Sequence, residues 1–158
     1  MLNHPIPPLF DANSRVLILG SFPSVKSREA AFFYAHPQNR FWRVLAALYA
    51  EPFPASTPER RALALKHHVA LWDVIASCEI RGSSDASIQS AAANDLRPIL
   101  DAAPIERIFV NGRTAEKLYR RHIEPQLGRP AIALPSTSPA NAAWSFERLC
   151  EAWKIILT

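Results

Sequence analysis

Three loops of this sequence concentrate side chains that could bind and cleave a ligand. Each loop follows a short apolar run, and they read GSFPS from residue 20, NGRT from residue 111 and PSTSPAN from residue 135. Asn111 in the second loop and Asn39 carry amides that can hold a water molecule or hydrogen-bond the edge of a base. A plain structural role stays open for both, because Asn39 precedes a helix as an N-cap would and Asn111 precedes Gly112 as in a common turn.

An aromatic cluster follows the first loop, at Phe32, Phe33 and Tyr34. We expect at least one of these rings to be buried in the core, whereas a ring in a polar cleft could stack on a flat heterocycle. The hydroxyls of residues 136–138 could donate to a phosphate, or this segment could simply lead into a helix. Near these loops lie two carboxylates, Asp73 and Asp85, from which we expect structural hydrogen bonds rather than acid–base work.

Apolar runs alternate with amphipathic segments along the whole chain. We expect strands near residues 15–20, 69–75, 105–111 and 131–134, and helices near residues 40–50, 57–67, 94–103, 114–122 and 145–157. The segments 21–39 and 80–87 are expected to be loops. This alternation predicts an α/β fold in which a parallel sheet is covered on both faces. Ligands bind such sheets beyond the carboxyl ends of the strands, so the three loops should meet at one cleft.

Length, composition and charge describe an ordinary globular chain. Its 158 residues fit one domain that spans residues 1–158. The net charge of +4 and a pI of about 9.4 allow a polyanionic partner without demanding one. No apolar run approaches the roughly 20 residues of a membrane helix, and the first residues lack the pattern of a signal peptide. We therefore expect a monomeric cytoplasmic protein with no membrane association.

Cysteine and histidine spacing gives no sign of a metal site. Cys78 and Cys150 form no CxxC pair, and the five histidines show no metalloenzyme spacing. Two thiols alone cannot supply the four ligands of an iron–sulfur cluster or of a zinc site built from cysteines. We expect two reduced thiols and a protein that needs neither a metal nor an organic cofactor.

Several longer motifs resemble one known group of enzymes. GSFPS followed by FFYAHPQNRFW resembles the first motif region of the uracil-DNA glycosylase superfamily, and LPSTSPANA resembles its second motif loop. LWDVIASCEIRGSSDASI and IFVNG are most similar to the hypoxanthine-DNA glycosylase family, which is related to the mismatch-specific uracil/thymine branch. The resemblance covers essentially the whole chain. It implies a three-layer α/β/α fold with a four-stranded parallel sheet and a pocket for a flipped nucleotide at the carboxyl end of that sheet.

The resemblance also implies residue roles. It assigns catalysis to Asn39, with support from Asn111, and a stacking role against the flipped base to Tyr34. The implied base-binding residues are Gly20, Ser21, Phe22, Tyr34 and Ser136. The implied DNA-binding residues are Ser24, Lys26, Ser27, Arg113, Thr137, Ser138 and Asn141. Phe22 departs from the superfamily pattern, because an Asp or Asn that handles the attacking water usually occupies its position. Ser136 likewise replaces a His or Asn, and Ala140 replaces a leucine wedge.

These features predict a DNA glycosylase acting in base excision repair on DNA that contains a deaminated base. Hypoxanthine is the first candidate, with uracil or xanthine as alternatives. Because hypoxanthine leaves more readily than adenine, positioning and electrostatic stabilisation of an oxocarbenium-like sugar could supply much of the rate. A non-catalytic nucleic-acid or nucleotide-binding module on the same fold is the alternative, and Phe22 supports it. A hydrolase using Ser21 or Ser24 is disfavoured, since no GxSxG elbow exists.

Overall fold

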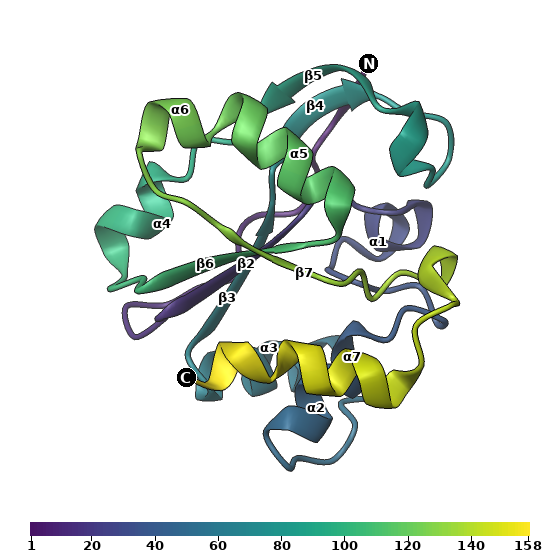
Figure 1. Cartoon of the computed structure of the whole chain (residues 1–158), viewed down its shortest axis with the longest axis vertical. Helices are drawn as coiled ribbons and strands as arrows, with labels where there is room; N and C mark the ends of the chain where they lie inside the picture. The colour runs from purple at the N-terminus through teal and green to yellow at the C-terminus, as the bar shows by residue number, and fades with distance from the viewer.

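A four-stranded parallel sheet forms the centre of the molecule in the computed structural model, which describes all 158 residues. Its strands are β2 (Val16–Gly20), β3 (Val69–Asp73), β6 (Arg107–Asn111) and β7 (Ile132–Leu134), in the order β3-β2-β6-β7. Helices lie on both sides of this sheet (Figure 1). The predicted three-layer α/β/α fold with a four-stranded parallel sheet is therefore confirmed. All five residues of β2 are buried, because the strand has neighbours on both edges and helices over both faces.

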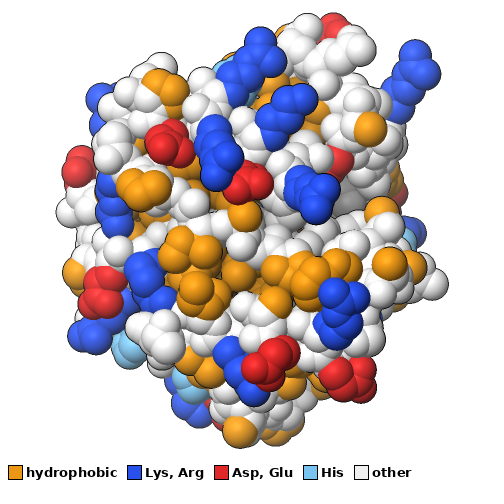
Figure 2. All heavy atoms as spheres, viewed as in Figure 1, with side chains coloured by type: hydrophobic (Ala, Val, Ile, Leu, Met, Phe, Trp, Pro, Cys, Tyr) orange, Lys and Arg blue, Asp and Glu red, His pale blue; other side chains and the backbone are white.

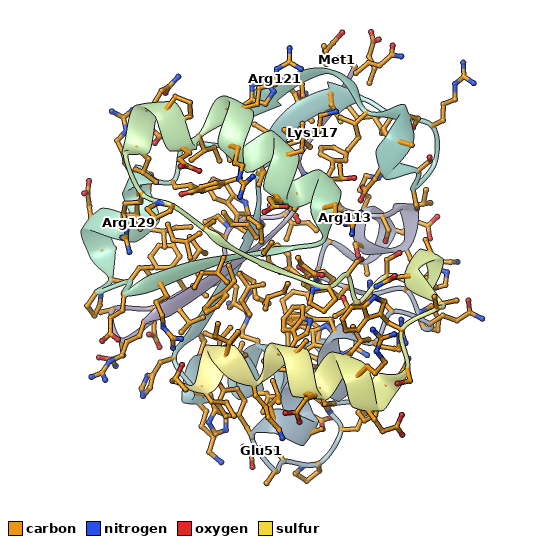
Figure 3. All side chains as sticks on the ribbon, viewed as in Figure 1. Met1, Glu51, Arg113, Lys117, Arg121 and Arg129 are labelled. Atoms are coloured by element: carbon orange, nitrogen blue, oxygen red, sulfur yellow. The ribbon has the colours of Figure 1, made fainter.

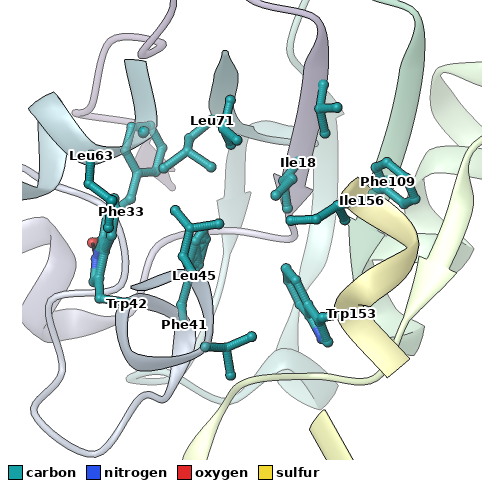
Figure 4. Close-up of a cluster of buried hydrophobic side chains, with 14 of the residues drawn as sticks. Ile18, Phe33, Phe41, Trp42, Leu45, Leu63, Leu71, Phe109, Trp153 and Ile156 are labelled. Carbon is teal, nitrogen blue, oxygen red and sulfur yellow. Dashed lines mark hydrogen bonds between the residues drawn. The ribbon is translucent and has the colours of Figure 1, made fainter. Parts of the chain in front are cut away.

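Side-chain alternation in β2 divides the interior into two clusters, one on each face of the sheet. Ile18 faces the first cluster, where it packs with residues of α2 (Phe41–Leu48), α3 (Thr57–Lys66) and α7 (Phe146–Trp153), as Figure 4 shows. Leu17 faces the second cluster, with residues of α4 (Arg97–Ala102) and α5 (Arg113–His122). Short helical segments α6 (Glu124–Leu127) and η3 (Lys154–Leu157) follow α5 and α7. None of the helices is both long and apolar enough to span a membrane.

The strand register brings the functional loops to one edge of the sheet. Gly20, the last residue of β2, pairs with Asp73, the last residue of β3. On the other side of β2, Asn111 ends β6 and pairs with Leu134, which ends β7. Because parallel strands end at the same edge, the segments after residues 20, 73, 111 and 134 all start from this edge.

The segment 21–39 differs from the expected unbroken loop, because it contains the short helix α1 (Val25–Ala30). Ser24 caps this helix, and its Oγ accepts a hydrogen bond of 3.2 Å from the backbone N–H of Ser27. Six residues are too few to show a 3.6-residue period, so the apolar pattern gave no signal for it. Two single 3₁₀ turns follow later in the chain: η1 (Asp85–Ser87) lies in the segment 80–87, and η2 (Pro139–Asn141) lies in the loop after β7.

A second, smaller antiparallel sheet was not predicted from the sequence. It consists of β1 (Leu2–Asn3), β4 (Ile75–Glu79) and β5 (Gln89–Ala93), in the order β1-β4-β5. The segment of β5 reads QSAAA and lacks the branched and aromatic residues that usually indicate a strand. Pairing of β1 with β4 holds the first residues of the chain against the body of the protein.

Asn94 and Thr57 are the N-caps that the sequence predicts for two of the helices, and the structure corrects both. Asn94 does not cap a helix, because its Nδ2 donates to the carbonyl oxygens of Asp73 at 2.9 Å and Ile75 at 3.2 Å. The following helix α4 begins only at Arg97. The cap of α3 is Ser56 rather than Thr57: the Ser56 Oγ accepts from the Glu59 N–H at 3.2 Å and donates to Glu59 Oε1 at 2.8 Å. This reciprocal pair is a capping box, which the spacing S-x-x-E signals.

Candidate active site

A cavity of about 290 Å³ opens at the carboxyl edge of the parallel sheet. The first and third of the three predicted loops supply much of its wall, and the second contributes Asn111, so the predicted convergence is confirmed. Its lining residues come from the ends of β2, β3 and β6 and from the loops after them: Gly20, Ser21, Phe22, Pro23, Ser24, Ser27, Phe33, Tyr34, His36, Asn39, Asp73, Ser83, Asp85, Asn111, Ser136, Thr137, Ser138, Pro139 and Ala140. A pocket of this size, with aromatic side chains among mainly polar lining residues, suits one small flat ligand that carries polar groups.

Gly20 lies where two polar groups of the cavity meet. A Cβ added at this position would lie 2.4 Å from Asp73 Oδ1 and 3.3 Å from the Tyr34 hydroxyl. A side chain here would displace the Asp73 carboxylate, so packing rather than backbone angles favours glycine at this position. The carboxylate of Asp73 and the hydroxyl of Tyr34 therefore lie at the same end of the cavity, over the end of β2.

Tyr34 presents an aromatic wall. One face of its ring stacks on Phe41, with the ring centroids 4.1 Å apart and the planes at 20°. The backbone of Tyr34 is left-handed, with φ of 53°, a conformation that costs energy for a bulky residue. Burial raises the pKa of the Tyr34 hydroxyl well above its ordinary value, and the negative charge of Asp73 adds to this shift. The hydroxyl thus stays protonated, and it is buried without a hydrogen-bond partner.

Asn39 makes a structural hydrogen bond through its side-chain oxygen and still has a free donor group at the cavity. Its Oδ1 accepts a hydrogen bond of 2.9 Å from the backbone N–H of Phe41, in the first turn of α2. The N-cap interpretation is thus correct for the side-chain oxygen, although the residue at the cap position itself is Arg40. The Nδ2 group of Asn39 has no partner within the protein and belongs to a residue that lines the cavity. The two interpretations of Asn39 are compatible, because they use different atoms of one amide.

Asn111 is engaged at both ends of its amide. Its Nδ2 donates to Thr137 Oγ1 at 3.0 Å, and its Oδ1 accepts from the Thr137 N–H at 3.1 Å. Thr137 is fully buried, so these two hydrogen bonds fix the third loop to the end of β6. The neighbouring Gly112 has φ of 99°, which favours glycine, and an added Cβ would lie 3.1 Å from the Cβ of Ser136. Asn111 therefore positions the loop that closes one side of the cavity.

Comparison with known proteins identifies the family. The family model described as the uracil DNA glycosylase superfamily matches residues 7–157. This chain belongs to the uracil DNA glycosylase superfamily. A protein from Methanosarcina acetivorans named hypoxanthine DNA glycosylase is 33% identical over 161 residues, which cover 99% of this chain and 98% of that protein. A protein of the same name from Methanosarcina barkeri is 33% identical over 137 residues, which cover 85% of each chain.

A solved structure supports the same assignment. The solution NMR structure of a Methanosarcina acetivorans protein, described as a candidate uracil DNA glycosylase, superposes with a TM-score of 0.83 at 30% sequence identity. The match covers 99% of this chain and 96% of that chain. The resemblance inferred from the motifs is therefore confirmed at the level of the superfamily.

The unusual residue of this superfamily member, Phe22, has an ordinary structural environment. Its side chain is buried, and its ring meets the ring of His4 edge to face, with the centroids 5.9 Å apart. The guanidinium of Arg28 lies 5.7 Å from the centroid of the Phe22 ring. Phe22 thus forms an apolar part of the wall and has no group with which to hold or activate water.

Carboxylates and one histidine form a polar cluster that the motifs did not reveal. Asp85 Oδ1 accepts a hydrogen bond of 2.7 Å from the Ser21 hydroxyl. Asp73 Oδ2 lies 2.7 Å from His4 Nε2. The expected structural hydrogen bonds of both carboxylates are therefore present. Burial of its carboxyl group raises the pKa of Asp85, the Ser21 bond opposes this shift, and the charge of Asp73 adds to it.

His4 was missed because nothing in the sequence connects it with the site. It lies 69 residues before Asp73, in a segment without helix or strand periodicity. The pairing of β1 with β4 and the bridge between Leu9 and Leu71 bring this segment over the end of the sheet. No group of three His, Cys, Asp or Glu side chains is placed to hold a metal ion.

The predicted DNA-binding residues divide into three groups. Four of them line the cavity: Ser24, Ser27, Thr137 and Ser138. Arg113 and Asn141 line an adjacent groove that also contains Ser136 and Ser138. Lys26 lines neither; it is exposed on α1, with its Nζ 3.8 Å from Glu29 Oε2.

Several of these side chains already have internal partners. The Thr137 hydroxyl and N–H bind Asn111, so a direct phosphate contact from Thr137 would require this pair to open. Ser27 is buried, and its Oγ accepts from the Ala35 N–H at 3.1 Å. Asn141 Nδ2 donates to the carbonyl oxygen of Ser136 at 2.9 Å. These contacts shape the loops, while DNA contact by these residues stays a prediction.

Basic side chains gather on the helix beside the groove. Figure 2 shows Lys and Arg side chains over α5, and Figure 3 places Arg113, Lys117 and Arg121 along that helix. Arg113 is the first residue of α5 and follows the end of β6 by two residues, so it is the basic residue of this helix nearest the site. The arrangement offers positive charge beside the cavity, where the phosphates of a bound strand could pass.

Proposed function

We propose that this superfamily member is a DNA glycosylase that releases hypoxanthine from DNA in base excision repair. The observation that carries the proposal is the cavity at the end of the parallel sheet, which combines the Tyr34 wall with the free amide donor of Asn39. A flipped base would lie in this cavity, with its sugar at the opening and its ring against aromatic side chains. The names of the two Methanosarcina relatives support hypoxanthine as the base.

The chemistry requires little proton transfer from the protein. The bond between the sugar C1′ and the base N9 breaks, its electron pair leaves with the base, and an oxocarbenium-like sugar forms. Water then adds to C1′, and its proton is released as the departing base gains one. The Nδ2 group of Asn39 would donate a hydrogen bond to the departing base and stabilise the negative charge that develops there. Its Oδ1 cannot turn toward the base without losing the Phe41 N–H bond.

The proposal also covers the macromolecule that the protein binds and the compartment in which it works. The substrate is DNA that contains a deaminated base, and the basic face along α5 supplies the attraction to phosphates. Binding should therefore weaken steeply as salt rises. We also propose a monomer that works in the cytoplasm, and the free thiols of Cys78 and Cys150 are consistent with a reducing compartment.

A base-release assay on defined duplexes tests the proposal. Single-turnover reactions would follow duplexes that carry one inosine, one deoxyuridine or one deoxyxanthosine, in the presence of a chelator. We expect release of hypoxanthine to be fastest and unaffected by the chelator. Release of uracil alone would reject hypoxanthine as the substrate without affecting the assignment to the superfamily. Binding without release of any base would instead favour the non-catalytic module that the buried Phe22 suggests.

A further inference from the structure

His4 holds Asp73 in one defined hydrogen-bonding state. The Nδ1 atom of His4 accepts a hydrogen bond of 3.2 Å from the backbone N–H of Ile6. A ring nitrogen that accepts carries no proton, so the proton of the neutral ring is on Nε2. Nε2 therefore donates to Asp73 Oδ2 at 2.7 Å. The side chains of His4 and Asp73 are only 4% and 6% exposed, so neither group exchanges freely with solvent.

The second oxygen of Asp73 has no partner in the protein. Oδ1 lies 2.4 Å from the position of a Cβ on Gly20, and the Tyr34 hydroxyl lies 3.3 Å from the same position. The Tyr34 hydroxyl is buried without a hydrogen bond. A buried hydroxyl without a partner is costly unless a ligand completes it, and Asp73 Oδ1 beside it is an acceptor that no protein group uses. This end of the cavity is thus built for a polar edge rather than for an apolar surface.

We propose that Asp73, oriented by His4, reads the Watson–Crick edge of the flipped purine and selects a ring nitrogen that carries hydrogen. The inference rests on the proposed function. The sugar stays attached to the strand at the opening, so the edge farthest from the N9 bond enters deepest. In hypoxanthine that edge presents N1–H, which donates to Asp73 Oδ1. In adenine N1 is an unprotonated acceptor, whose lone pair the carboxylate oxygen repels.

The fixed histidine makes an unusual variant informative. In Asp73→Asn, the His4 Nε2–H still needs an acceptor, so the new amide must turn its oxygen toward His4. Its NH₂ group then faces the cavity and replaces the original acceptor with a donor. A donor suits N1 of adenine and opposes N1–H of hypoxanthine. The variant should therefore reverse the preference for the base rather than merely weaken binding.

Binding to uncleavable DNA separates recognition from catalysis. The probes are duplexes whose target nucleotide is a 2′-fluoroarabino analogue of inosine or adenosine, because the fluorine disfavours the oxocarbenium-like sugar. The ratio of the two dissociation constants is measured for the parent and for each variant. The cost of flipping belongs to the DNA, so it cancels when these ratios are compared between proteins. One hydrogen bond to a charged group corresponds to a change of roughly 10- to 100-fold.

Three variants decide the outcome. Asp73→Asn should shift the ratio toward adenine by roughly 10-fold or more. Asp85→Asn is the matched control, because it removes the same charge from the same cavity and should leave the ratio at the parent value. In the double variant His4→Ala with Asp73→Asn the amide can turn either way, so the ratio should lie between those of the parent and of Asp73→Asn. An unchanged ratio in Asp73→Asn, or an equal shift in Asp85→Asn, would overturn the proposal.

A probe on the parent protein keeps the inference testable if Asp73→Asn does not fold. N1-methylhypoxanthine lacks the donor hydrogen, so the parent should bind its 2′-fluoroarabino duplex at least about tenfold more weakly than the hypoxanthine duplex. Equal affinity would reject the role of Asp73. The base-release assay tests the proposed function independently of this binding experiment. If the parent releases hypoxanthine but binds both duplexes equally, the proposed function stands and only the role of Asp73 is rejected.

Discussion

The two sides of the cavity treat their polar groups in opposite ways. On the side of β6, the oxygen and the nitrogen of the Asn111 amide both bond to Thr137. On the side of β2 and β3, one oxygen of Asp73 and the hydroxyl of Tyr34 have no partner. Since buried polar groups are nearly always paired, we propose that the first side is scaffold and that a ligand completes the second. Asn39 combines both states, with a paired oxygen and a free NH₂ group.

The largest effect is expected from Asn39→Asp. The carboxylate keeps an oxygen for the Phe41 N–H and removes the donor that we assign to the departing base. Loss of a transition-state hydrogen bond costs about 3 kcal/mol, which corresponds to a rate loss of a hundredfold or more. Stability should change little, because the bond to the helix remains. Single-turnover release of hypoxanthine and thermal melting measure the two quantities on the same sample.

Asn39→Ala is the companion variant. It loses the helix bond as well, so it should melt lower, with a stability loss of about 1 kcal/mol, and it should also cleave slowly. If both variants cleaved at nearly the parent rate, Asn39 would be only a structural residue of α2, and the division of its amide between two roles would be wrong.

Asn111→Ala tests the side of the cavity that is internally satisfied. Removing this amide leaves the buried N–H and hydroxyl of Thr137 without partners, which costs roughly 1–3 kcal/mol each when no water replaces them. We expect a clear loss of stability and a smaller loss of rate than in Asn39→Asp. Urea denaturation gives the first quantity and single-turnover release the second. A stable variant with a large rate defect would show that Asn111 acts on the substrate directly.

Much of the framework could be predicted from the sequence because it depends on local signals. The run VLILG is apolar throughout, as a strand buried on both faces must be, and it forms β2 as expected. The loops that follow such strands converge because parallel strands end at the same edge. The positions of Asn39 and Tyr34 in the cavity follow from motif likeness and not from any local rule.

The remainder depends on contacts between distant segments. β5 is a strand only because β4 pairs with it, since QSAAA has no strand preference of its own. His4 reaches Asp73 because β1 pairs with β4 and Leu9 bridges to Leu71. The division of the Asn39 amide into a paired and a free end could not be seen in the sequence either, because it depends on the orientation of one side chain.

A smaller effect is expected from Tyr34→Phe, which tests the unsatisfied side. The variant keeps the ring that stacks on Phe41 and removes only the unpaired hydroxyl. The free protein should be as stable as the parent or more stable, because an unsatisfied buried group disappears. If the base completes this hydroxyl, release of hypoxanthine should slow by roughly tenfold or less. Tyr34→Ala, which also removes the stacking surface, should slow it further; equal rates for parent and Tyr34→Phe would limit Tyr34 to stacking.

The smallest effect concerns Asp85, whose carboxyl group shares the cavity with Asp73. Its pKa is raised in the folded protein, chiefly by burial, so folding favours the protonated form. The corresponding stability is present at acid pH and is lost as pH rises from the ordinary value of 3.8 through the raised value. Asp85→Asn cannot ionise, so its stability relative to the parent should improve between pH 4 and neutral pH in urea denaturation. The gain should be modest, because the residue as a whole is exposed although its carboxyl group is desolvated at the cavity, and water screens its charge. A relative stability that falls over this range would mean that the Ser21 bond outweighs burial and that Asp85 belongs with the satisfied side of the cavity.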